Sequence, residues 1–169
     1  MEEYMDMELK EYLEPAEIAR RWNPICPKYK ILDVKEVVDR APALMSRIAR
    51  AAYRATATLP AGYSEVELNT AIDHLMDQEE IMITREVKGK RKEVDIRPGI
   101  FRLAGGVKGH ILEINMELLI GSTGNVRPEE VLLRLSGDGG VPVDPEDFRI
   151  RRTALFAEGD TGPISLWEV

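Results

Sequence analysis

The sequence predicts an α+β fold in which a mainly antiparallel mixed sheet has helices packed on one of its faces. At several places apolar and polar residues alternate with the period of two that is typical of half-buried strands. Between some of these segments apolar residues recur at helical spacing. Lys88-Gly89-Lys90 is a hairpin signal, because glycine adopts a positive φ easily. Hairpins combined with helices favour antiparallel pairing.

The first third of the chain carries four predicted elements. Alternation of methionine and leucine with polar residues indicates a strand almost at the start of the chain. The next helix has Pro15 in its first turn, where proline is tolerated, and Asn23-Pro24 as its stop signal. The predicted elements are a strand over residues 5–9, a helix over 15–24, a strand over 31–38 and a short helix over 42–49.

The middle of the chain contains the clearest helix. Ser64 and Glu67 form a capping box, and apolar residues then follow at helical spacing as far as Met76. The alternation of apolar and polar residues predicts strands on both sides of this helix. These strands cover residues 53–58, 81–87 and 91–96.

The last third is predicted to contain two strands and one helix. A turn or short helix after Pro98 ends at Gly105-Gly106, and a strand with one apolar face then covers residues 112–118. Pro128 opens a helix that Gly137 closes, and residues 148–156 form a last strand. We expect a single domain over residues 1–158 and a weakly ordered tail over 159–169.

Composition narrows the class of protein. The 169 residues are 44% hydrophobic and 31% charged, which is typical of a globular domain, and no apolar run is long enough to span a bilayer. We therefore expect a cytoplasmic protein that does not bind membranes. Cys26 is the only cysteine, so no internal disulfide can form and no thiolate cluster can hold zinc. His74 and His110 are far apart, and His110 is predicted to lie in the core. We expect no metal and no cofactor.

Charge is unevenly distributed along this acidic chain, whose net charge is −7. Acids dominate both ends, and two basic stretches lie between them. Such segregation can mark a face that binds polyanions, and the alternative interpretation is a solvated hairpin tip. If the two stretches lie close together, they form one positive surface. The candidate polyanion-binding residues are Arg47, Arg50, Arg54, Lys88, Lys90, Arg91, Lys92 and Arg97.

No motif in the chain supports a catalytic site. Gly121-x-x-Gly124 before a helix could cradle a phosphate, but it lacks the Gly-Lys-Ser/Thr ending of a nucleotide-binding loop. Glu129 and Glu130 in the first helical turn would also repel an anion. A glycine-rich turn capped by Asn125 is the simpler interpretation. For Asp95, the simplest interpretation is an ion pair on a sheet face.

Four motifs between residues 41 and 156 resemble a radical-SAM-linked domain of unknown function found in bacteria. In order, they are Ala41-Pro42-Ala43-Leu44-Met45, Lys92-Glu93-Val94-Asp95-Ile96-Arg97-Pro98, Gly124-Asn125-Val126-Arg127-Pro128-Glu129-Glu130-Val131-Leu132 and Arg152-Thr153-Ala154-Leu155-Phe156. The resemblance implies a radical SAM protein as partner, fused or separately encoded. The family domain has a further segment ahead of Tyr4, so we expect a shortened chain. The strand predicted over residues 5–9 would then lie beside an open edge and favour a homo-oligomer.

A weaker resemblance links this domain to the tRNA pseudouridine synthases. It rests on Trp22-Asn23-Pro24, the predicted strand over 31–37 and the stretch Ala49 to Arg54. It implies a pseudouridine-synthase-like fold and RNA contact by Arg47, Arg50 and Arg54, whereas the catalytic aspartate of the synthases would fall outside this chain.

Three functional hypotheses follow. The first is an accessory domain without catalytic activity, linked to a radical SAM protein and related to RNA. The alternatives are a divergent RNA-modifying enzyme whose active-site loop is missing here, and a protein-binding adaptor. We name no catalytic residue, and whether the full protein is an enzyme is left open.

Overall fold

The computed structural model describes residues 3–37, 42–121, 123–160 and 162–168. The chain forms two compact units. The smaller is Tyr4–Leu44, and the larger is Met45–Val169 together with the first three residues. Each unit is described by itself.

The smaller unit is built around the helix α1 (Pro15–Ile25). Pro15 occupies its first turn as predicted, and the helix continues one residue past Pro24. After the helix, the side chain of Asn23 holds the chain in place. Its Nδ2 donates to the carbonyl of Ile31 (3.0 Å), and its Oδ1 accepts from the Ile31 N–H (2.8 Å).

Two strands predicted in the smaller unit are wrong. Residues 4–9 and 31–37 are not in strands, and Met5 is 65% exposed. Alternation shows only that a segment could cover an apolar face, whereas a strand also needs a hydrogen-bonding partner along its edge. Neither segment pairs with another strand in the described part of the chain. Val38, the last residue of the second prediction, lies outside the described residues.

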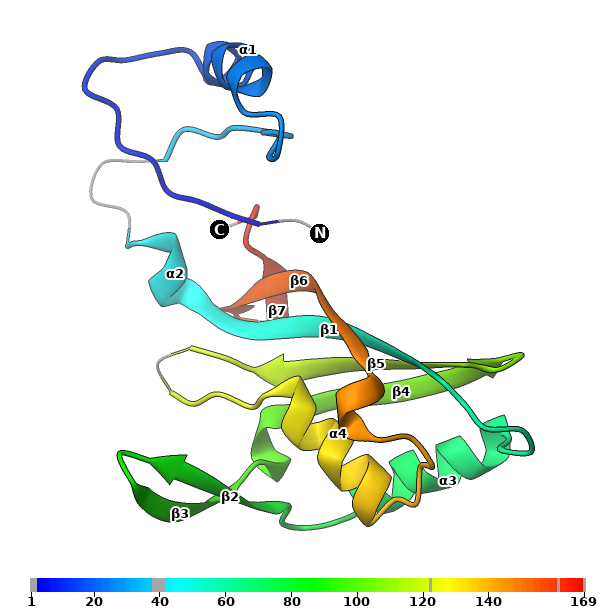
Figure 1. The fold of residues 1–169 in the computed structure, drawn as a ribbon. Coiled ribbons are helices and arrows are strands. Elements are labelled where there is room, and N and C mark those ends of the chain that lie inside the picture. The colour runs from blue at the N-terminus through cyan, green and yellow to red at the C-terminus, as the bar shows by residue number, and fades with distance from the viewer. Residues whose placement is uncertain (1–2, 38–41, 122, 161, 169) are drawn as a thin grey trace. The chain divides into compact units, whose positions relative to one another are not determined.

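The larger unit contains a five-stranded sheet and a separate two-stranded hairpin (Figure 1). In the sheet the strand order is β4-β5-β1-β6-β7, every pair is antiparallel, and the hairpin is β2-β3. The elements are α2 (Leu44–Arg47), β1 (Ile48–Thr58), α3 (Glu65–Met76), β2 (Met82–Val87), β3 (Lys90–Asp95), a 3₁₀ helix (Arg97–Gly99), β4 (Ile100–Lys108), β5 (Ile111–Leu119), α4 (Pro128–Gly137), a 3₁₀ helix (Pro145–Asp147), β6 (Arg149–Gly159) and β7 (Gly162–Ser165).

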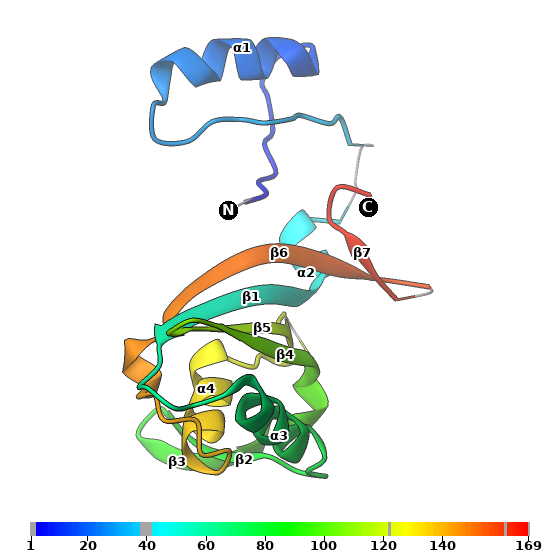
Figure 2. The same ribbon diagram turned by 90° about the vertical axis from the view of Figure 1, so that its right-hand side faces the viewer.

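Both long helices of this unit cover the same face of the sheet (Figure 2). The capping box predicted for α3 is present, with Ser64 and Glu67 bonded to each other's backbone. Small residues line the core face of β1, where Ala51 and Ala55 are fully buried. On β5 the predicted apolar face is buried as well, from Leu112 to Leu118. The α+β class, with helices on one face of an antiparallel sheet, is confirmed.

Several predicted boundaries need correction. The short helix α2 ends at Arg47, because Ile48 and the residues after it pair with β5 and β6. The predicted turn up to Gly105-Gly106 is instead strand β4, which passes through both glycines. Gly105 allows close packing, because a Cβ there would lie 2.9 Å from a methyl group of Leu68 on α3.

The position of His110 also differs from the sequence pattern, and the residues after Gly159 include one more strand. His110 is exposed in the turn between β4 and β5 and is not in the core, because β5 begins only at Ile111. Residues Gly162–Ser165 form β7, which pairs with β6, and Leu166 after it is buried. A four-residue strand with two small residues and a proline has too little alternation to be predicted.

Candidate functional site

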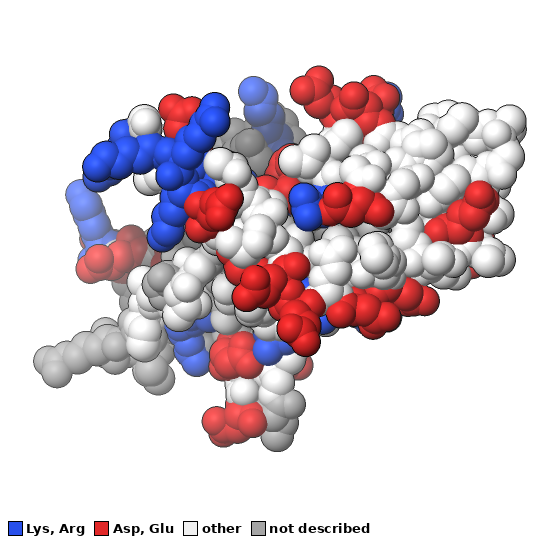
Figure 3. All heavy atoms as spheres, turned by 90° about the horizontal axis from the view of Figure 1, so that it is seen from below, with Lys and Arg blue, Asp and Glu red and all other residues white. Residues whose placement is uncertain are grey.

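The hairpin β2-β3 presents a cluster of exposed positive charge. Lys88 and Gly89 form its turn with positive φ values of 51° and 74°, the geometry that tight hairpin turns require. Lys88, Lys90, Arg91 and Lys92 are all exposed, as the sequence predicts. Within the described ranges, no ion pair or hydrogen bond involves these four side chains. In Figure 3, Lys and Arg gather over the hairpin at the left of the view.

The strand register sorts these charges between the two faces of the hairpin. Lys90 pairs with Val87 and Lys92 with Arg85, so all four lie on one face. Arg91 lies on the other face, opposite Glu86. The first face therefore carries only positive charge toward the tip.

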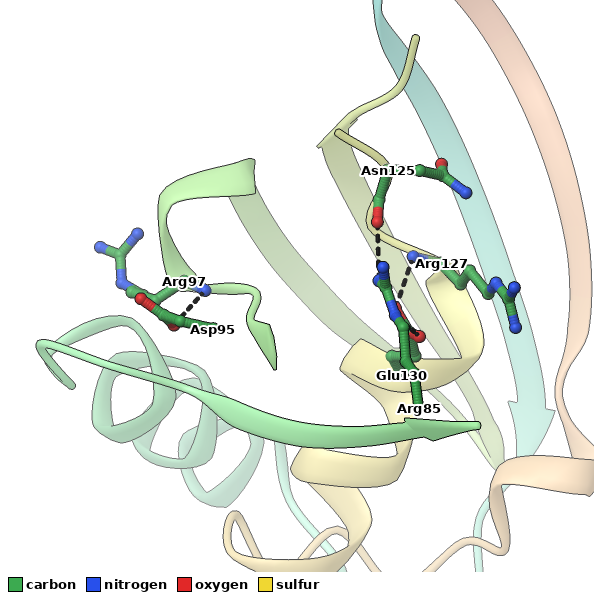
Figure 4. Close-up of polar contacts among 6 residues, drawn as sticks. All are labelled: Arg85, Asp95, Arg97, Asn125, Arg127 and Glu130. Atoms are coloured by element: carbon green, nitrogen blue, oxygen red, sulfur yellow. Dashed lines mark hydrogen bonds and ion pairs between the residues drawn. The ribbon is translucent and has the colours of Figure 1, made fainter. Parts of the chain in front are cut away.

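A bidentate ion pair joins the hairpin to helix α4 (Figure 4). The Nε of Arg85 lies 2.7 Å from Oε1 of Glu130, and Nη2 lies 2.7 Å from Oε2. Nη2 also donates to the carbonyl of Asn125 (2.6 Å), while Glu130 accepts from the backbone N–H of Arg127 (2.9 Å). The sequence predicts a cap at Asn125, but the N-cap residue of α4 is Arg127. The carbonyl of Asn125 instead helps to hold the hairpin.

Asp95 and Arg97 stabilise the base of the hairpin. Asp95 makes no ion pair in the described structure, and its Oδ1 accepts from the N–H groups of Ile81 (2.8 Å) and Arg97 (2.9 Å). The guanidinium of Arg97 points away from Asp95 (Figure 4) and donates to the carbonyls of Met76 (3.1 and 2.8 Å) and Ile100 (3.3 Å). Arg97 thus satisfies one carbonyl at the end of α3 and one at the start of β4, and most of its donors are occupied.

The arginines of the first basic stretch lie elsewhere. Ala51 and Ala55 point into the core, so Arg50 and Arg54 point to the face of the sheet that carries no helix. The hairpin lies on the helix side of the sheet (Figures 1 and 2). The expectation that the two stretches form one positive surface is therefore wrong for Arg50 and Arg54. Arg47 is exposed at the end of α2.

Arg50 is also neutralised by its neighbours. Its Nη2 lies 2.9 Å from the carboxylate of Glu158 and its Nη1 3.5 Å from that of Glu117, and its guanidinium stacks 3.8 Å from the ring centre of Phe101. Arg54 has a looser contact, 3.5 Å from Glu113.

Sequence reasoning missed a second basic region, a depression on the helix-free face of the sheet. It is lined by Arg54, Thr56, Glu113, Arg149, Ile150, Arg151, Arg152 and Thr153. The arginines of β6 lie in a stretch of sequence that is acidic overall, which hid them. The alternation Arg149-x-Arg151 within a predicted strand was the available signal, because alternate residues share one face.

The other sequence candidates carry no assembled site. Gly121 has a φ of +118°, and a Cβ there would lie 2.4 Å from the carbonyl oxygen of Ile48, so glycine is required for packing. No group of three or more His, Cys, Asp or Glu among the described residues could hold a metal ion. Cys26 is half-buried and free. In the described parts of the chain, no helix is both long and apolar enough to span a bilayer.

The fold and its surfaces define an α+β domain with a basic hairpin and an arginine-lined depression. The chain belongs to a family described as uncharacterised and conserved in bacteria (DUF2344), whose model matches residues 1–128. Neither a curated protein nor a solved structure matches the chain.

Proposed function

We propose that this protein is an accessory domain without catalytic activity that binds the phosphate backbone of RNA through the tip of hairpin β2-β3. One observation carries the proposal. Four cationic side chains occupy positions 88–92, all are exposed, and none is ion-paired within the described structure. The chain as a whole has a net charge of −7. The rest of the chain therefore carries a net negative charge, which favours binding of a polyanion at its clustered cations.

The anchoring of the hairpin supports this role. Arg85 and Glu130 connect it to α4, and Asp95 connects its base to the backbone. The exposed cations are thus presented on a fixed support. Lysine meets phosphate as a point charge and reads no base, so we expect binding that is independent of RNA sequence and strongly dependent on salt.

The choice of RNA and of a partner comes from the sequence resemblances. The stretch Ala49 to Arg54 and the motif Trp22-Asn23-Pro24 resemble the tRNA pseudouridine synthases, which favours RNA as the polyanion. The four motifs between residues 41 and 156 favour a radical SAM protein as the partner. In this proposal the domain brings RNA to that partner.

Fluorescence anisotropy with a labelled structured RNA at several salt concentrations tests the RNA proposal. About four neutralised phosphates would give a slope of roughly −3 in a plot of log affinity against log salt. The double substitution K88A/K90A should flatten this slope by about 1.5, since each phosphate contact contributes about 0.7–0.9. Thermal stability should hardly change, because exposed charges contribute little to folding.

A matched control is the double substitution K28A/K30A. Both lysines are exposed, and their removal changes the net charge by the same amount. This variant should keep the slope of the wild-type protein. Binding that does not depend on salt, or an equal loss of slope in the two variants, would contradict the proposal.

Co-expression with radical SAM proteins of the same bacterium tests the partner. We expect one of them to co-purify with this protein in a fixed ratio, with or without nuclease treatment. Failure to co-purify would contradict the partnership and leave the RNA measurement unaffected.

A further inference from the structure

The register of β1, β5 and β6 brings together charged residues that are far apart in sequence. Arg54 is the Cα partner of Arg151, and Thr56 is the partner of Arg149. Thr56 is also the partner of Glu113 on β5. Residues directly opposite in an antiparallel pair share a face, so these five side chains lie on the helix-free face of the sheet.

These residues line a hollow of suitable size for a small ligand. Its volume is about 680 Å³, and typical ligand sites measure about 300–1,000 Å³. It is open to solvent, so that a ligand could enter it directly.

The charge within the hollow is not balanced. Glu113 is the only acid among its lining residues, and its Oε1 lies 3.5 Å from Nε of Arg54 and accepts a hydrogen bond from Asn115 (2.9 Å). Arg149 and Arg151 are exposed, and their side chains have no hydrogen bond or ion pair within the described ranges. Arg152 also contributes to the lining, but its Nη2 donates to Glu3 at 2.5 Å, so that its charge is already paired.

The neighbouring backbone supplies further donors. β6 pairs with β7 only from Phe156 onward, so its outer edge beside the hollow has no strand partner in the described structure. Alternate N–H groups of β6 therefore point away from β1 without a ladder bond. Free backbone amides at a sheet edge favour anions.

We propose that this hollow binds a phosphate-bearing ligand of about nucleotide size. The planar guanidinium groups of Arg149 and Arg151 can each hold two phosphate oxygens. The hydroxyls of Thr56 and Thr153 can donate to the same group. The site is separate from the hairpin and does not rest on the RNA proposal, because it uses different residues on the other side of the sheet.

Isothermal titration calorimetry at low salt with inorganic pyrophosphate and with a short RNA oligonucleotide tests this site. R149A/R151A should weaken phosphate binding by at least about tenfold, because it removes charge-assisted hydrogen bonds. If only pyrophosphate binding is weakened, the ligand is a free phosphorylated molecule. If RNA binding is weakened as well, the phosphate belongs to RNA. Both outcomes support the site.

Two further variants make the test specific. K88A/K90A removes the same amount of charge from the hairpin and should bind pyrophosphate as tightly as the wild-type protein does. The two proposals can therefore fail independently of each other. R149K/R151K keeps the charge but loses the fork geometry, and should bind at least about threefold more weakly.

Circular dichroism should report the same fold for all variants, since Arg149 and Arg151 are exposed. The proposal is overturned if wild-type protein binds neither probe, if R149A/R151A binds both as tightly as wild type, or if R149K/R151K shows no loss.

Discussion

Arg85 and Glu130 form two hydrogen bonds of 2.7 Å that join the hairpin β2-β3 to the first turn of α4. Their side chains are only 20% and 14% exposed, so water screens the pair weakly. Glu130 also keeps the pKa of Arg85 above its ordinary value, mainly through this hydrogen bonding. The pair connects elements that are 45 residues apart in sequence.

Removal of one partner should therefore lower the free energy of unfolding more than removal of both partners does. We expect R85A to lower the free energy of unfolding by about 2 kcal/mol, because it leaves a mostly buried carboxylate without its cation; a fully buried pair would cost about 3–5 kcal/mol. The double variant R85A/E130A should cost less than the sum of the single variants, in urea denaturation. Strictly additive costs would show that the two side chains do not interact.

Arg97 should affect stability and not RNA affinity. Its guanidinium is bonded to the carbonyls of Met76 and Ile100. R97A should therefore lower the free energy of unfolding by about 1–3 kcal/mol, because hydrogen bonds from a charged group are lost. The salt dependence of RNA binding should stay as in the wild-type protein, opposite to the behaviour of K88A/K90A. A flattened salt slope in a fully folded R97A protein would instead place Arg97 in the RNA contact.

The two neighbouring glycines of β4 should differ in their tolerance of alanine. A Cβ on Gly105 would lie 2.9 Å from a Leu68 methyl group and 3.1 Å from the carbonyl oxygen of Glu113, whereas a Cβ on Gly106 would meet no atom within 4 Å. We expect G105A to destabilise the fold by about 1–3 kcal/mol through overpacking. G106A should be neutral or slightly stabilising, since alanine restricts the unfolded chain. Thermal melts of both variants check this, and equal melting temperatures would refute the close approach of α3.

The pH dependence of the smaller unit should reflect Glu17. Hydrogen bonds from Arg20 and then Arg21 lower its pKa from 4.5 to about 2. A lowered folded-state pKa stabilises the fold above pH 4.5, and this contribution is lost as the pH falls toward 2. NMR titration should place the pKa of Glu17 well below 4.5, and R20A/R21A should return it toward 4.5. A wild-type pKa near 4.5 would mean that the ion pairs do not form in solution.

Local signals predicted most of the larger unit. The capping box of Ser64 and Glu67, the Lys88-Gly89 turn and the apolar alternation of β5 each act within a few residues, and each was visible in the sequence. The strand predicted over residues 5–9 had equal alternation and failed, because no other segment pairs with it in the described structure. The prediction of a turn at Gly105 was wrong. Glycine is needed there because Leu68 packs closely against it, and this contact was not visible because Leu68 is distant in sequence.

The two candidate sites also differ in how well the sequence predicts them. The exposed hairpin tip was predictable, because its charges and its turn are adjacent in the sequence. The hollow at Arg149 and Arg151 was not, because it depends on the pairing of β6 with β1, almost one hundred residues earlier. Nor could the sequence reveal that Arg97 and Arg50 are occupied by partners.

The central place of β1 in the sheet has a consequence for how the chain folds. Ala51 pairs with Leu118 on one side and with Leu155 on the other, at separations of 118 − 51 = 67 and 155 − 51 = 104 residues. Such distant pairing slows folding, and during synthesis β1 leaves the ribosome long before β6 exists. Both of its edges are then exposed to other chains. Five of the eleven residues of β1 are alanines and two are arginines, a composition with a low tendency to aggregate. This composition protects the nascent protein until β6 has been synthesised.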